Sequence, residues 1–176
     1  MAVKKSRIYR LLTVTGIALA SLLILASFAV YISPRIGWRV DGLRSGSMAP
    51  LLNTGDMVVT RPVVPEAVKV GDIIIFRSVD KRANLISHRV VNIERNSPLS
   101  FRTKGDANEN PDPFVVPAEN LVGELAFHAP LLGYAVLYLQ TPMGLMASLV
   151  IPGVVIIAAC LKSLRDELAA KTRIRG

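Results

Sequence analysis

Two long apolar runs without a charged side chain, residues 11–32 and 143–161, frame the amino-acid sequence. About 20 such residues span the hydrocarbon core of a bilayer as a helix. Both runs therefore predict transmembrane helices. A cleaved signal peptide is the alternative for the first run and a buried helix of a globular domain for the second, although shorter apolar stretches are enough for those roles.

The segment between the two runs, residues 33–142, has a different pattern. Short stretches rich in Val, Ile, Thr and Phe are separated by Gly, Asp, Asn and Pro, which is typical of strands joined by turns. The predicted strands are residues 57–60, 72–76, 86–93, 100–104 and 121–127. Because no amphipathic helix of about 10–15 residues alternates with them, the pattern favours a mainly β, antiparallel domain over a parallel α/β sheet.

The net charge of +8 comes mostly from the two ends of the chain. Residues 1–10 carry +4 and residues 162–176 carry +3. Basic residues beside membrane spans favour the cytoplasmic side, so we expect two cytoplasmic tails, with residues 33–142 outside the cytoplasm. The basic tails also suit contact with anionic lipid headgroups, and no nucleic-acid partner is needed to explain the charge. The single cysteine, Cys160, lies in the second apolar run and excludes an intrachain disulfide.

Two residues suggest nucleophilic chemistry. Ser47 lies in a Gly- and Pro-containing turn, and a hydroxyl becomes a nucleophile when a positioned base accepts its proton. His88 alternates with apolar residues in a predicted strand and is a candidate base. The alternatives are that Ser47 is an ordinary turn residue and that His88 is a hydrogen-bonded core residue. Ser45 is either a second hydrogen-bond donor or a solvated turn residue. His128 is interpreted as structural.

A polar loop over residues 104–113 contains the candidate acids Asp106 and Asp112. A buried carboxylate can fix the tautomer of a catalytic histidine and stabilise its protonated form. A calcium loop is the alternative, but the spacing lacks the regular oxygen ligands and the terminal Glu of such loops, and no metal site is predicted.

Several sequence boxes follow one another in the order found in a known family. They are Ser45-Gly46-Ser47-Met48-Ala49-Pro50, Gly55-Asp56-Met57-Val58, Gly71-Asp72-Ile73-Ile74, Ser87-His88-Arg89-Val90, Thr103-Lys104-Gly105-Asp106 and Gly133-Tyr134. Over the whole chain they resemble type I signal peptidases, in particular the branch of the endoplasmic reticulum, of archaea and of some Gram-positive bacteria, in which a histidine replaces the usual lysine base.

The resemblance implies a mainly β, two-sheet antiparallel catalytic domain between N- and C-terminal transmembrane helices. It implies Ser47 as nucleophile, His88 as general base and Asp112 as the third member, with Asp106 as the other acid of the pattern. Ala49 departs from the family's usual acidic residue, and Pro111 and Pro113 flank Asp112.

The implied activity is removal of signal peptides from exported preproteins after small residues, without a cofactor. The expected partners are preproteins, the lipid bilayer and the secretion translocon. The expected location is a prokaryotic plasma membrane, with the endoplasmic reticulum as the alternative. Two other functions remain open: a serine autoprotease or sheddase with a dedicated substrate, and a noncatalytic membrane-anchored β module.

Overall fold

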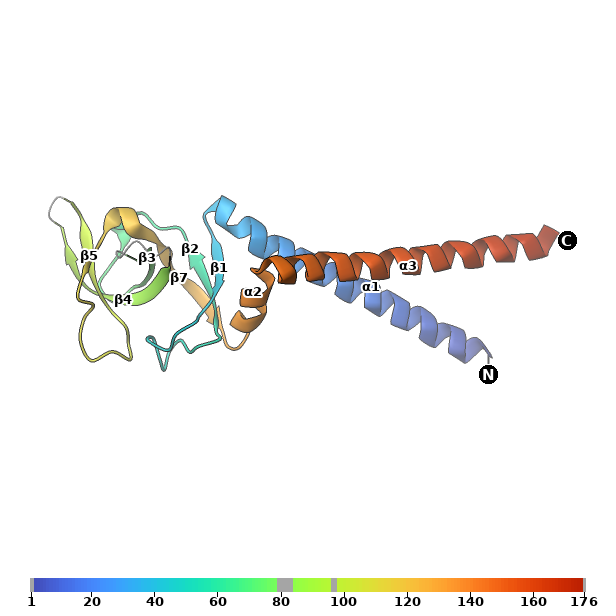
Figure 1. The fold of residues 1–176 in the computed structure, drawn as a ribbon, viewed down its shortest axis with the longest axis horizontal. Helices are drawn as coiled ribbons and strands as arrows, with labels where there is room; N and C mark the ends of the chain where they lie inside the picture. Colours follow the sequence, from blue (N-terminus) through green and yellow to red (C-terminus); the bar gives the residue numbers. More distant parts are fainter. Residues whose placement is uncertain (1, 79–83, 96–97, 176) are drawn as a thin grey trace. The chain divides into compact units, whose positions relative to one another are not determined.

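The computed structural model describes residues 2–78, 84–95 and 98–175. The chain divides into two units, which Figure 1 shows in the colours of the sequence. Met1–Tyr31 and Leu139–Gly176 form a helical unit, and Ile32–Tyr138 form a unit rich in strands.

The helical unit contains helix α1 (Ala2–Ile32) and helix α3 (Pro142–Arg175). Two segments are long and apolar enough to cross a membrane, judged by length and composition: Leu11–Ile36, which begins in α1 and ends beyond it, and Pro142–Arg165, which lies within α3. Most of their described apolar side chains are exposed, which differs from the buried core helix considered for the second run. A helix that is apolar on all sides requires an apolar environment.

The strand-rich unit is one antiparallel sheet. In the described part of the chain, the strands have the order β1-β2-β7-β3-β4-β5-β6. They are β1 (Arg39–Gly42), β2 (Met57–Arg61), β3 (Ile73–Arg77), β4 (Leu85–Glu94), β5 (Ser100–Lys104), β6 (Val115–Pro117) and β7 (Leu121–Ala129). The mainly β, antiparallel character predicted from the pattern is confirmed.

The two-sheet arrangement expected from the resemblance differs from this single sheet, and β7 is the reason. The first half of β7 pairs with β3, with Gly123 opposite Ile75. Its second half pairs with β2, where Phe127 lies opposite Val59. One long strand thereby joins two groups of strands. Register shifts at Val59/Thr60, Ile75/Phe76 and Val90/Asn92 mark β-bulges, and bulges bend the strands that contain them.

Short helical elements complete the strand-rich unit. They are η1 (Ser33–Ile36), η2 (Pro65–Ala67), η3 (Ala118–Asn120) and α2 (Gly133–Leu139), the last of which ends at the first residue of the helical unit. Pro34 and Pro65 lie in the first turns of η1 and η2. Proline is tolerated there because the first turn of a helix does not use its amide protons.

Two apolar clusters form the core of the sheet. The larger consists of Val68, Ile74, Phe76, Val90, Phe101 and Val116. The smaller consists of Met48, Leu52, Val58 and Ile73, with Leu43 and Leu125 packed against it. Met48 and Leu52 belong to the loop between β1 and β2, so burial of their side chains fixes this loop on the sheet.

Candidate active site

The loop after β1 places Ser47 beside the sheet. The amide of Ala49 donates to the carbonyl of Gly46 over 3.0 Å, and the amide of Leu52 donates to the carbonyl of Met48 over 3.0 Å, which makes a compact turn. Met48 next to Ser47 is buried, whereas Ser47 is partly exposed. Burial of Met48 thus fixes the backbone next to Ser47, while the Ser47 hydroxyl stays accessible.

A second set of contacts closes the base of this loop. The amide of Gly55 donates to the carbonyl of Leu43, and the amide of Leu43 donates to the carbonyl of Asp56, both over 2.9 Å. Gly55 has φ +89°, and a Cβ at this position would overlap the Tyr134 ring. Only glycine fits this conformation and this contact. The buried carboxylate of Asp56 accepts bonds from the amides of Asn53 and Leu131.

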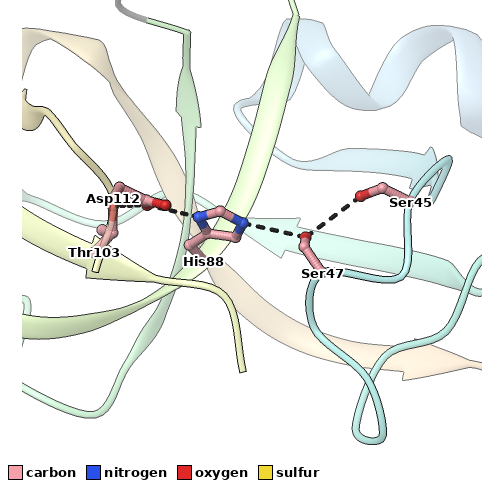
Figure 2. A network of polar contacts seen from close by, with 5 residues as sticks. All are labelled: Ser45, Ser47, His88, Thr103 and Asp112. Carbon is pink, nitrogen blue, oxygen red and sulfur yellow. Dashed lines mark hydrogen bonds and ion pairs between the residues drawn. The ribbon is translucent and has the colours of Figure 1, made fainter. Parts of the chain in front are cut away.

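His88 lies in the middle of β4, opposite Ile74 of β3, and is buried. Its Nε2 is 3.1 Å from Oγ of Ser47, and its Nδ1 is 2.6 Å from Oδ2 of Asp112. Figure 2 shows the imidazole between these two side chains. Because a carboxylate only accepts hydrogen bonds, Nδ1 donates to Asp112, which leaves Nε2 of the neutral ring free to accept from the Ser47 hydroxyl. The ring of Phe76 packs edge-on at 6.4 Å between centroids.

Asp112 is 7% exposed and lies in the polar loop that leaves β5. Its amide donates to the carbonyl of Thr103 over 2.8 Å. Its Oδ2 accepts a second side-chain bond, from Oγ1 of Thr103, at 2.6 Å. The prolines on either side of Asp112 are compatible with this geometry, since the amide that forms the backbone bond belongs to Asp112 itself.

Asp106 has different partners. Its Oδ1 accepts from Nε of Arg89 at 2.8 Å, and its Oδ2 accepts from a terminal guanidinium nitrogen at 2.6 Å. The hydrogen bonds to Asp106 raise the pKa of Arg89 above its ordinary value; burial opposes this effect and the charge of Asp106 adds to it. Asp106 and Asp112 therefore have different hydrogen-bond partners, Arg89 for the first and His88 for the second.

The turn that contains Asp106 also holds the backbone of Ser47. The amide of Ala107 donates to the Ser47 carbonyl over 2.9 Å. A Cβ added to Gly105 would lie 2.6 Å from that carbonyl oxygen, so glycine permits the close approach of the two loops. The position of Ser47 thus depends on the polar loop as well as on its own turn.

The other two candidates lie apart from the His88 ring. Oγ of Ser45 is 3.4 Å from Oγ of Ser47, on the side away from His88 in Figure 2. His128 lies on β7, and its Nδ1 is 3.9 Å from Oδ2 of Asp56. This Nδ1 atom is buried and has no hydrogen-bond partner among the described residues, so the structural interpretation of His128 stays a prediction.

Serine hydrolases are defined by a serine, a histidine and a buried aspartate joined in one hydrogen-bonded series. They are recognised by this geometry rather than by the order of the residues in the sequence. The residues named from sequence for a hydrolase, Ser47, His88 and Asp112, are brought together here. Thr103 and Arg89 had no assigned role, although both belong to the sequence boxes. The sequence signal that could have identified Thr103 is the alternation of buried and partly exposed residues along β5, which buries its side chain.

Comparison with known proteins supports the same class. Signal peptidase I W of Bacillus subtilis is 33% identical over 87 residues, which cover 48% of this chain and 45% of that protein. The human signal peptidase complex catalytic subunit SEC11C is 36% identical over 70 residues, which cover 39% of this chain and 36% of that protein. The dog SEC11C is similar to the same extent. No family model matches the chain.

The matched part of the chain spans less than half the length of these curated relatives. The resemblance to the type I signal peptidase family is confirmed at modest identity over part of the chain. Activity, substrates and partners of this chain are therefore proposals, to which the site geometry contributes independent support.

Proposed function

We propose that this chain is a membrane-anchored serine endopeptidase that removes N-terminal signal peptides from exported preproteins. The observation that carries the proposal is the position of His88, whose two ring nitrogens lie within hydrogen-bond distance of Ser47 and Asp112. The relatives are named signal peptidases, one in a bacterium and others in mammals, and this supports the substrate class.

The proposed reaction proceeds through an acyl-enzyme. Oγ of Ser47 attacks the scissile carbonyl carbon while Nε2 of His88 takes the hydroxyl proton. The protonated His88 then gives this proton to the amine of the leaving segment, which becomes the new N-terminus of the mature protein. Water, deprotonated by His88, hydrolyses the ester between Ser47 and the signal peptide and restores both side chains.

Charge develops at two places, and the site has a group for each. Asp112 stabilises the positive charge on His88 and fixes the ring orientation. The backbone amide of Ser47 and the hydroxyl of Ser45 are the proposed donors to the oxyanion of the tetrahedral intermediate. The spacing of 3.4 Å between the two serine hydroxyls supports Ser45 in this role, because the oxyanion forms next to the attacking oxygen.

The two apolar helices support the location. We propose that residues 11–32 and 143–161 cross the bilayer, that residues 1–10 and 162–176 are cytoplasmic, and that residues 33–142 act outside the cytoplasm. A prokaryotic plasma membrane is the proposed location, with the secretion translocon as a partner. A substrate segment lying extended beside the Ser47 loop, with small side chains before the cut, is consistent with the cleavage pattern of signal peptides.

The decisive experiment is cleavage of a preprotein by the purified full-length chain in detergent, with the new N-terminus read by sequencing. Wild type should release the mature protein after a small residue, and Ser47→Ala should lose about 10⁴-fold or more of the activity while remaining folded. Cutting restricted to its own chain or to one partner would indicate the autoprotease alternative. Equal activity of folded Ser47→Ala would remove the serine-peptidase proposal and favour the noncatalytic module.

A further inference from the structure

We propose that Thr103 is a positioning residue that holds Asp112 in the orientation His88 needs; this inference rests on the proposed peptidase function. Among the described residues, the Thr103 hydroxyl bonds to Asp112 and not to Ser47 or His88, so its effect is exerted through the acid. Figure 2 shows Thr103 beside Asp112, at the end of the series of contacts opposite the serines.

Two hydrogen bonds connect Thr103 with Asp112. Oγ1 of Thr103 donates to Oδ2 of Asp112 at 2.6 Å, and the amide of Asp112 donates to the carbonyl of Thr103 at 2.8 Å. Thr103 is fully buried within β5, with 0% exposure, and Asp112 is 7% exposed. One bond therefore fixes the main chain of Asp112 and the other fixes its carboxylate, both to a strand of the sheet.

The two side-chain bonds to Asp112 share one oxygen. Oδ2 accepts from Nδ1 of His88 and from Oγ1 of Thr103, each at 2.6 Å. A carboxylate oxygen has room for two donors, and bonds to a charged acceptor are stronger than bonds between neutral groups. The Thr103 hydroxyl thus restrains rotation of the carboxylate and replaces solvent as a donor to it, so that Oδ2 remains directed at Nδ1.

Positioning of Asp112 requires the hydroxyl of Thr103 rather than the shape of its side chain. Valine has nearly the same shape as threonine and is equally suited to a buried strand. Thr60 on β2 provides the comparison, because it is also fully buried and its Oγ1 has no hydrogen-bond partner among the described residues. A Thr→Val change at each site removes a hydroxyl from the same sheet, but only at Thr103 does it remove a donor to the acid.

The first test measures kcat and KM for cleavage of one preprotein by the full-length chain in detergent. Thr103→Val should lower kcat about 10- to 100-fold, the loss that corresponds to one hydrogen bond to a charged group, with KM nearly unchanged. Thr103→Ser should retain most of kcat because it keeps the donor. Thr60→Val should match wild type. Wild-type kcat in a folded Thr103→Val variant would overturn the proposal.

A second test asks whether Thr103 acts through Asp112. In an Asp112→Asn background, adding Thr103→Val should change kcat by less than about twofold, since residues that act as a unit are not additive. A full additional 10- to 100-fold loss would show an independent effect and would contradict the positioning role. If Thr103→Val does not fold, Thr103→Ala and Thr103→Ser replace it, because these two variants both lack the γ-methyl group and differ only in the hydroxyl. Equal kcat of this pair would also overturn the proposal.

Failure of the inference differs from failure of the proposed function. An inactive Ser47→Ala variant together with a fully active Thr103→Val variant would leave the peptidase intact and reject the role of Thr103. An active, folded Ser47→Ala variant would reject the peptidase itself, whatever the Thr103 variants show.

Discussion

The Asp106 carboxylate binds the Arg89 guanidinium through both oxygens, at 2.8 and 2.6 Å. Arg89 follows His88 on β4, and successive side chains of a strand point to opposite faces. The two acids of the polar loop are therefore bound by neighbouring strand residues on opposite faces, Asp112 by His88 and Asp106 by Arg89. The role of each acid can thus be tested separately.

Asp106→Asn should destabilise the strand-rich unit. We expect a loss of about 1–2 kcal/mol, because the ion pair is partly exposed but bidentate and joins the polar loop to β4. Activity should decline with the folded fraction, measured by thermal unfolding alongside turnover.

The matched control for Asp106 is Asp41→Asn. The Arg39–Asp41 pair has similar side-chain exposure, 31% and 21% against 33% and 20% for Arg89–Asp106, but it lies within one strand. Its loss should therefore have the smaller effect on unfolding. An Asp106→Asn variant that is inactive at wild-type stability would contradict a purely structural role.

Asp112→Asn should affect the chemistry instead. The amide keeps the shape but not the charge, and it favours the wrong tautomer of His88; in the serine protease that serves as the general template, the corresponding change lowers kcat about 10⁴-fold. Single-turnover cleavage of a preprotein measures this loss. Near wild-type kcat would remove Asp112 from the proposed triad.

The sequence pattern predicted the longer strands because β-branched runs between turn residues are a local signal. The prediction missed β1 and β6, which have four and three residues, too few for a periodic pattern. It also could not show that β7 joins both groups of strands into one sheet, since pairing depends on contacts between distant residues.

In the site too, local sequence features identified individual residues but not their long-range partners. Ser47 and His88 lie in sequence boxes and Asp112 was assigned by the family resemblance, and the hydrogen-bond geometry brings the three together. An Asp directly after Gly105 is typical of a turn in which its side chain caps nearby amides, but Asp106 pairs with Arg89, a partner 17 positions away. Turn propensity describes only neighbours in the sequence, so it could not identify this long-range partner.

Ser45→Ala tests the proposed oxyanion donor. Removing one such donor lowers kcat about 10²–10³-fold in a related site, and a similar loss in kcat with little change in KM is expected here. Ser45→Thr retains a hydroxyl and should keep more of the activity. If Ser45→Ala has wild-type kcat, Ser45 is a turn residue and the second donor must come from elsewhere.

The pH profile tests the base. Only neutral imidazole can take the Ser47 proton, so kcat/KM should fall with a slope of one on a logarithmic scale where acid protonates His88. The measurement uses one preprotein and a detergent that is stable over the whole pH range measured. A flat profile down to pH 4, or an active His88→Ala variant, would argue against His88 as the base.

The membrane topology can be tested with sealed membrane vesicles whose outer surface corresponds to the cell exterior. Residues 1–10 carry +4 and residues 162–176 carry +3, and such basic segments next to a span favour the cytoplasmic side. A protease added outside should therefore cut within residues 33–142 and spare tags at both ends, whereas detergent should expose both tags. Inverted vesicles should give the reverse pattern. Digestion of the C-terminal tag alone from outside would mean that residues 143–161 do not cross the bilayer, and α3 would then lie on the membrane surface or against the strand-rich unit.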